Sequence, residues 1–393
     1  MKKTHTIISY IKSQLPAICS LVFLLLLGCY FYLLAHPAKE EITSSSGYSL
    51  IYENAVVTDV LSDTCEPDKN IENSLRGRQE LRVLVESGKY AGETYTVNNV
   101  IGPLYGHHLS AGDSIIVALS AYEEGQVYAS VYEYNRTGAI LILIVLFFIV
   151  TVLVGGKTGA KSLLGLVITI TALLLVLLPL LFNGWPTLPT TLLICSWITC
   201  TVFLILSGWD KKTACAVLGT VAGMVFATLF ALLAQSLLHI NGYREENAEA
   251  LLQLRQTGES MPRIRYLLVS GVMISALGAV MDVAMSISSA IKELSLVGNK
   301  MTFKQLFLSG MNIGRDMVGT MTNTLILAII GSGMMLIMYI ASLNLPLRQF
   351  LSSPYLALEL VSSLSSSIGV ILTVPLTAFI SAIFYAYTKK EEA

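Results

Sequence analysis

The chain has 393 residues, of which 54% are hydrophobic and only 13% are charged, with a formal net charge of −1. The charged share is about half that of a typical soluble domain. The composition therefore predicts a polytopic, mostly α-helical membrane protein. A charge so close to zero gives no electrostatic basis for binding nucleic acid or an acidic substrate.

Eight apolar segments are long enough to cross a hydrocarbon layer about 30 Å thick. They are residues 16–35, 138–155, 162–182, 188–208, 213–239, 266–291, 318–343 and 355–387. The last segment is too long for one upright crossing, and Pro375 is placed where it could kink the helix.

The distribution of Lys and Arg predicts that both chain ends are cytoplasmic, because most basic residues of the short connections then lie inside. Four arginines in one outer loop run against this rule: Arg244, Arg255, Arg263 and Arg265. The expected organisation is a cytoplasmic N-terminus (1–15), an anchor (16–35), an extracytoplasmic β domain (36–137), a seven-helix bundle (138–387) and a cytoplasmic tail (388–393).

The first span could instead be a signal peptide, since Lys2 and Lys3 precede its apolar core. No small-x-small cleavage site follows it. The run that ends at Cys29 is similar to a lipoprotein cleavage box, but residues 30–34 continue apolar, where a processed lipoprotein turns polar. These features favour an uncleaved anchor.

Residues 36–137 have the composition of a soluble domain, and their apolar residues alternate as in strands. Strands are predicted at residues 52–61, 80–86, 93–100, 114–121 and 126–134, with a turn at 87–92. This pattern is typical of a small all-β barrel, and the oligonucleotide/oligosaccharide-binding type is one option.

The tyrosines of this domain, and its cysteine and histidines, are of the residue types that form binding sites. The tyrosines form either a stacking platform for sugars or bases or, as aromatic strand propensity favours, strand faces and a membrane-facing rim. They are Tyr105, Tyr122, Tyr128, Tyr132 and Tyr134. Cys65 is the domain's single cysteine, and no CxxC or HExxH spacing is present. We therefore interpret His107-His108 as a solvated loop and expect neither a metal nor a cofactor.

One carboxylate lies inside an apolar run. Asp282 is ten residues before Lys292, about 15 Å by helical rise, which places it near the middle of the bilayer. The residues on its helical face are small or polar: Gly271, Ser275, Gly278, Ser286 and Ser289. We expect Asp282 to face protein or water and to act as a cation or proton site.

A second polar cluster follows in residues 314–325. Asn323 is eight residues past Arg315, about 12 Å into the layer, a depth that matches Asp282. The oxygen ligands expected around Asp282 are Asn323, Ser286, Thr320 and Thr322. The glycines Gly310, Gly314 and Gly319 could loosen this helix and expose carbonyls, as discontinuous transporter helices do.

The alternative interpretation of the Asp282 face is structural. Gly271, Ser275 and Ala279 are spaced by four, the small-xxx-small pattern through which membrane helices pack closely. Asp282 would then be a neutral, hydrogen-bonded carboxyl group that fixes the helix register.

Weaker pathway or gating candidates lie elsewhere. Glu359 shares one helical face with Ser362, Ser366, Gly369, Thr373 and Thr377. It is only about 6 Å from the outer end of its span, where an interfacial glutamate is equally expected. Arg315 and Asp316 stand at a cytoplasmic helix start. They are either a gating pair or an ordinary interfacial pair, in which Asp316 complements the helix dipole and Arg315 anchors to lipid headgroups.

No catalytic pattern is present, so we do not expect an enzyme. The carboxylates of Asp282 and Glu359 differ in depth and lack a Gly-x-Gly-Asp run, which argues against an aspartyl-protease dyad. Residues 155–159 do not fit the phosphate-loop spacing, and GxSxG is missing.

Three segments carry a family resemblance: GAVMDVAMSISS (278–289), GRDMVGTMTNTL (314–325) and GGKTG (155–159). Over most of residues 138–387 the chain resembles the YibE/F-like family of bacterial integral membrane proteins. The resemblance implies a multi-pass protein of the bacterial cell membrane, with an extracytoplasmic β domain and an uncharacterised activity.

The functional hypothesis is transport or conduction of a small ion or solute at Asp282. The rival is a non-catalytic membrane scaffold whose outer β domain binds a partner or a cell-wall component. The expected partners are the lipid bilayer, a small cation or proton, and either a second copy of the chain or a paralogous membrane protein; nucleic acid is not expected.

Overall fold

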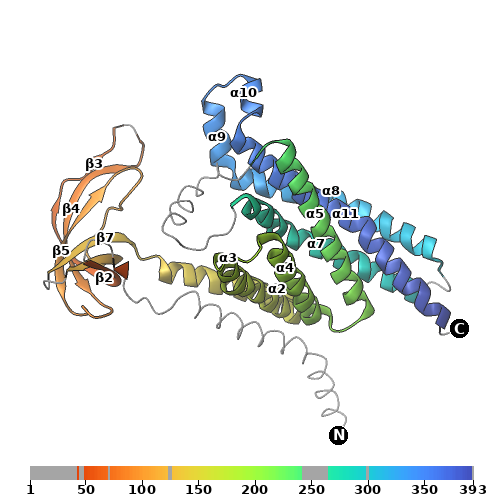
Figure 1. Ribbon diagram of the computed structural model, residues 1–393. Coiled ribbons are helices and arrows are strands. Elements are labelled where there is room, and N and C mark those ends of the chain that lie inside the picture. Colours follow the sequence, from red (N-terminus) through yellow and green to blue (C-terminus); the bar gives the residue numbers. More distant parts are fainter. Residues whose placement is uncertain are drawn as a thin grey trace, which may run out of the picture. The chain divides into compact units, whose positions relative to one another are not determined.

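The computed structural model describes residues 42–43, 48–69, 71–122, 126–240, 264–297 and 301–391. The chain divides into two compact units, His36–Leu153 and Met1–Ala35 with Val154–Ala393 (Figure 1). The predicted first span, its lipoprotein-like box and three of the four outer-loop arginines (Arg244, Arg255 and Arg263) lie outside the described residues, while Arg265 lies in the first turn of the helix that follows the loop.

The described part of the first unit contains seven antiparallel strands. They are β1 (Ile42–Thr43), β2 (Tyr48–Asp63), β3 (Glu66–Pro67), β4 (Leu75–Val85), β5 (Thr94–Ile101), β6 (Ser114–Tyr122) and β7 (Val127–Tyr134). The five strands predicted from alternation are confirmed as β2, β4, β5, β6 and β7, because every second residue faces a core that includes Val57, Leu81 and Val117.

The long strands are ordered β5-β4-β2-β6-β7, so β5 and β7 are the two edges. Within the described residues no ladder joins these edges, and the sheet is an open half-barrel instead of a closed barrel. The oligonucleotide-binding topology stays a prediction.

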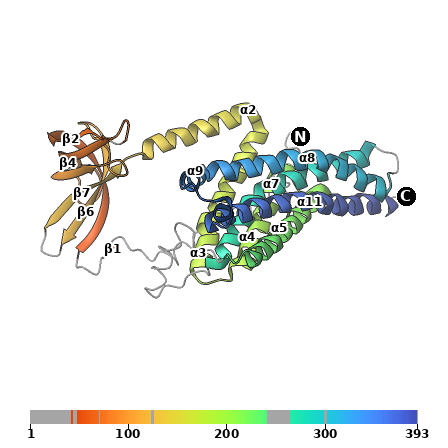
Figure 2. The same ribbon diagram turned by 90° about the horizontal axis from the view of Figure 1, so that it is seen from above.

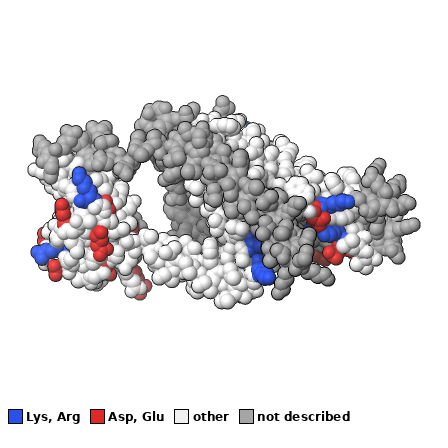
Figure 3. Space-filling model, turned by 90° about the horizontal axis from the view of Figure 1, so that it is seen from below, with Lys and Arg blue, Asp and Glu red and all other residues white. Residues whose placement is uncertain are grey.

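The second unit is helical. Its elements, with the segment that leads into it, are α2 (Thr137–Ala172), the π-helix η1 (Leu173–Leu177), α3 (Leu178–Phe182), α4 (Thr187–Ser207), α5 (Lys211–Leu237), α7 (Ile264–Val297), α8 (Phe303–Ser332), α9 (Met334–Ser342), α10 (Leu347–Leu351) and α11 (Pro354–Glu391). Among the described residues, 5 helices are long and apolar enough to cross a membrane, or 6 if the bent pair α8–α9 counts as one span. In Figure 3 the described helical surface on this face is white apart from a few Lys, Arg, Asp and Glu side chains, most of them toward one end. Charged groups are costly in lipid.

The predicted second and third spans fall in one helical run, Thr137–Phe182, of 46 residues. At 1.5 Å per residue this run is about 69 Å long, more than twice the hydrocarbon thickness. Gly156, with φ 55° and ψ −137°, breaks the helical path between the two predicted spans. A left-handed φ costs glycine little, which explains why the break falls there.

Helix α11 lies against α5, α7 and α8 (Figure 2). It is one continuous helix with Pro375 inside it. Glycines allow the close approach: a Cβ atom on Gly223 of α5 would lie 1.9 Å from Thr373 Oγ1, and one on Gly314 of α8 would lie 2.2 Å from Val374 Cγ1. Membrane helices pack closely through such small residues.

A polar contact joins the neighbouring ends of α5 and α7. The Asp210 carboxylate caps α5 by accepting from the Lys211 N–H at 2.7 Å, and it pairs with the Lys292 ammonium group of α7. The hydrogen bond from Lys292 holds the pKa of the Asp210 carboxyl below its usual range. The hydroxyl of Ser288 also donates to the Lys212 carbonyl, at 2.6 Å. These contacts set the register of α7 against α5.

We predict that Gly223→Ala destabilises the helical unit, because the added methyl group meets Thr373 and must displace it. Overpacking of this kind costs about 1–3 kcal/mol, and thermal unfolding of the purified protein in detergent would show a lower midpoint. Gly278→Ala is the matched control, since a Cβ there meets nothing within 4 Å among the described residues. Equal midpoints for the two variants would contradict the close α5–α11 contact.

Candidate functional site

Asp282 lies near the middle of α7, on a face that the described helices leave exposed. The exposed residues of this face are Gly271, Ser275, Gly278, Asp282 and Ser286, and we call them the α7 stripe. The residues between them are mostly buried, which is the periodicity expected of one helical face. The predicted small and polar face is therefore present, and the acid is on it.

Two apolar cores flank the α7 stripe. On one side Leu277 and Met281 pack into a core shared with α4 and α5, and on the other Ala276 and Val283 pack into a core shared with α8 and α11. Asp282 thus stands between two packed surfaces, not inside either. Of the small-xxx-small pattern Gly271, Ser275 and Ala279, Gly271 meets no described side chain within 4 Å, whereas Ser275 contacts α11.

The α7 stripe is joined to α11 by a pair of hydroxyl groups. Ser275 Oγ lies 2.9 Å from Ser366 Oγ, and the Ser366 hydroxyl also donates to the Val272 carbonyl at 3.4 Å. Ser275 is two helical turns from Asp282, about 10 Å by helical rise. The structure therefore brings one residue predicted for the last span, Ser366, to the same face as Asp282.

The residues predicted on α8 lie differently. Asn323 is exposed, about 200° around the helix from Met321, which packs into the core, so its side chain points away from that core. The Thr320 hydroxyl donates to its own helix at the Met317 carbonyl, and the Thr322 hydroxyl is buried with no hydrogen-bond partner among the described residues. No described hydrogen bond brings Asn323 to Asp282.

The charged pair at the start of the predicted α8 span is exposed. Arg315 donates to Asn312 Oδ1 at 3.2 Å within its own helix, and Asp316 is open to the surroundings. These positions supply no contact to the α7 stripe among the described residues.

The glycines inside α8 do not break the helix, and the bend lies after its last residue. The expectation that Gly310, Gly314 and Gly319 loosen α8 is wrong: α8 is continuous from Phe303 to Ser332, and Gly310 and Gly314 are close-packing positions. The chain instead bends by 61° between α8 and α9, at Gly333.

Glu359 of α11 lies beside this bend. A Cβ on Gly333 would be 3.6 Å from Glu359 Oε1. The carboxylate is therefore next to the first turn of α9, where the unpaired N–H groups of a helix favour negative charge. The signal in the sequence was the triplet Gly331-Ser332-Gly333, which interrupts a long apolar segment.

The polar face predicted on the last span is largely a packing surface. Ser362 is half-buried, while Ser366, Thr373 and Thr377 are buried. Thr373 and Thr377 face the glycines Gly223 and Gly219 of α5. Sequence reasoning missed a second pair of buried hydroxyls that lack a hydrogen-bond partner among the described residues: Ser365 and Ser367.

Exposed tyrosines of the β unit form two ring pairs. Tyr122 and Tyr128 pair edge to face, with ring centroids 5.7 Å apart, and Tyr132 pairs with Tyr52 at 4.7 Å. A pocket of about 270 Å³ lies between β5 and β7, the two sheet edges. Its lining includes Tyr105, Tyr132, Tyr134, Asn98 and Glu133.

Comparison with known proteins gave a family match that covers the helical unit and the part of α2 that precedes it. The model of the YibE/F-like protein family matches residues 143–387, which is well over half of the chain and contains the α7 stripe. Comparisons with curated proteins and with solved structures gave no match. The chain belongs to the YibE/F-like family, and it is a membrane protein with several long apolar helices.

Proposed function

We propose that this YibE/F-like chain transports or conducts a small ion or solute across the bacterial cell membrane, and that Asp282 binds the transported cation or a coupling proton. The supporting observation is the placement of Asp282: mid-helix in an apolar span, on an exposed stripe of small and polar residues. An acid at that depth costs about 2.5–3.5 kcal/mol on insertion scales, so such residues mark ion or proton paths.

The α7 stripe supplies oxygen near the acid. Ser286 is one turn away on the same face, and the Ser275–Ser366 pair extends the polar surface to α11. Carboxylate and hydroxyl oxygens are hard ligands that suit Na⁺, and the carboxylate alone suits a proton. We assign no ligand role to Asn323, because its side chain points away from the core that flanks the stripe.

Glu359 is a second group in this proposal. A helix interrupted at Gly333 with a carboxylate beside it has the form of the discontinuous helices at transporter sites. We propose that Glu359 passes the ion or proton between the bulk solvent and the interior, with both chain ends in the cytoplasm and the β unit outside. No catalytic role is proposed.

The scaffold function remains the second candidate, and the pocket between β5 and β7 favours it. Aromatic rings with an amide and a carboxylate around about 270 Å³ suit a sugar-like or peptide-like ligand. In that case the helices only anchor the β unit.

The test of transport is flux in proteoliposomes that carry a proton gradient or a Na⁺ gradient and an internal dye for the same ion. We predict flux with the unmodified protein and a decrease of at least about tenfold with Asp282→Asn, since a hydrogen bond to a charged group is worth about 1.5–3 kcal/mol. Glu293→Gln, an exposed acid near the end of the same helix, is the control and keeps the flux. Equal flux for both variants, or none for any protein, would reject the proposal in favour of a scaffold.

Cysteine labelling tests whether the α7 stripe meets water. In a background that lacks the six native cysteines, we predict that Asp282→Cys reacts with a charged, membrane-impermeant thiol reagent. Val283→Cys, whose side chain is fully buried, stays unmodified. If Asp282→Cys reacts only with an apolar maleimide, the stripe faces lipid and the proposed ion path is wrong.

A further inference from the structure

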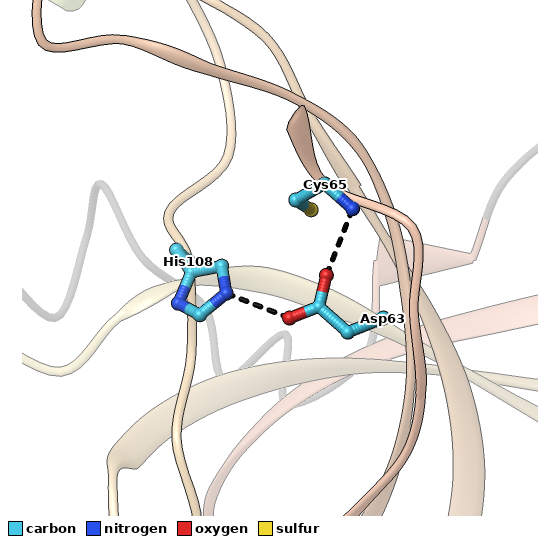
Figure 4. A group of neighbouring side chains, drawn as sticks. All are labelled: Asp63, Cys65 and His108. Atoms are coloured by element: carbon cyan, nitrogen blue, oxygen red, sulfur yellow. Dashed lines mark hydrogen bonds and ion pairs between the residues drawn. The ribbon is translucent and has the colours of Figure 1, made fainter. Parts of the chain in front are cut away.

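Three side chains of different chemistry meet at one end of the β unit (Figure 4). Asp63 is the last residue of β2, Cys65 lies in the turn to β3, and His108 lies in the segment between β5 and β6. One potential ligand atom of each lies within 4.8 Å of the others. Of the residues that the structure describes, only these three form a group able to hold a metal ion.

Hydrogen bonds already hold the carboxylate in place. His108 Nε2 donates to Asp63 Oδ2 at 2.7 Å, and the Cys65 N–H donates to Oδ1 at 2.9 Å. The backbone N–H of Cys65 is the largest cause of the low pKa of Asp63, so the group is ionised at neutral pH. The side chains of Asp63 and His108 are 35% and 40% exposed, which gives an ion access from solvent.

A row of buried amides behind the cluster fixes its geometry. Asp63 pairs with Gln79 across β2 and β4, and Gln79 pairs with Asn99 across β4 and β5. Gln79, only 1% exposed, donates to Asp63 Oδ2 at 3.1 Å and to the Leu109 carbonyl at 3.0 Å, and its own oxygen accepts from the Leu109 N–H at 3.0 Å.

Asn99 completes this row. It is 3% exposed and donates to Gln79 Oε1 at 3.2 Å and to the His107 carbonyl at 2.8 Å. The two amides therefore clamp the segment that carries His108 against the strand that ends in Asp63. Metal sites rely on such second contacts to orient their ligands.

The position of Cys65 also depends on a glycine. A Cβ on Gly77 of β4 would lie 2.6 Å from both the Cys65 Cα and the Thr64 carbonyl oxygen. Only glycine leaves room for the turn to lie directly on β4. The thiol is consequently held beside Asp63, and it is a free cysteine.

We propose that Asp63, Cys65 and His108 bind a divalent transition-metal ion of the zinc class, with water in the fourth position. A thiolate with an imidazole selects Zn²⁺ over Ca²⁺ or Mg²⁺, which prefer oxygen. Bond lengths of about 2.0–2.3 Å in a tetrahedron put ligand atoms about 3.3–3.7 Å apart, so shifts of about 1 Å close the site. Binding releases the Cys65 thiol proton and replaces the His108 Nε2–H hydrogen bond to Asp63. The imidazole changes tautomer by exchange with solvent, so that its proton lies on Nδ1 and neutral Nε2 binds the metal.

The experiment uses the full-length protein in detergent, stripped with a chelator and then titrated with Zn²⁺ or Co²⁺. We expect one metal ion per chain, a thiolate-to-Co²⁺ charge-transfer band, and a higher unfolding temperature with Zn²⁺. Cys65→Ser abolishes the band, His108→Gln weakens binding by more than about 100-fold, and Gln79→Leu weakens it by about 10- to 100-fold, as outer-contact changes do.

His107→Gln is the matched control. His107 is next in sequence to the proposed ligand, but it pairs with Glu133 and Arg136 instead. Its substitution leaves metal binding unchanged. Circular dichroism shows whether each variant keeps its strands. Absence of binding by the unmodified protein overturns the proposal, as does equal binding by folded Cys65→Ser and His108→Gln. Because the experiment measures metal binding, its result is independent of the flux measured for Asp282 variants, and either proposal can be rejected without the other.

Discussion

The helical unit depends on the close approach of α11 to α5, α7 and α8. A bilayer gives helices no hydrophobic reason to associate, so their contact rests on shape and van der Waals packing. Gly219 and Gly223 of α5 admit Thr377 and Thr373, while Gly310 and Gly314 of α8 admit apolar side chains of α7 and α11. This tight contact leaves one face of α7 uncovered by the described helices, and Asp282 stands on that face.

The elements themselves were predictable from sequence because their signals are local. Alternation located the five long strands, and apolar length located the helices. The stripe around Asp282 also follows from helical period alone. The side chains that lie near Asp282 were harder to predict from sequence. The depth of Asn323 in its span does not give the direction in which its side chain points, because that direction is set by the packing of Met321. The roles of Gly314 and Gly333 differ for the same reason: only the neighbouring helix shows which glycine packs and which one breaks the span.

The cluster in the β unit shows a second limit of sequence reasoning. The spacing between Cys65 and His108 matches no metal motif, and His107-His108 by itself suggests a solvated loop. Strand register brings the residues together, through the row formed by Asp63, Gln79 and Asn99 across three strands. Such long-range pairing has no short-range signature, although buried amides in a strand hint that a polar network lies behind it.

The central claim is that Asp282 exchanges a proton or a cation within the membrane span. Infrared difference spectroscopy of the purified protein in lipid measures this directly, because the carbonyl stretch of a protonated carboxyl group disappears when the group ionises or binds a cation. We expect a carboxyl band that responds to pH or to added Na⁺ and is missing in Asp282→Asn. A difference spectrum that is the same in the unmodified protein and in Asp282→Asn would contradict it.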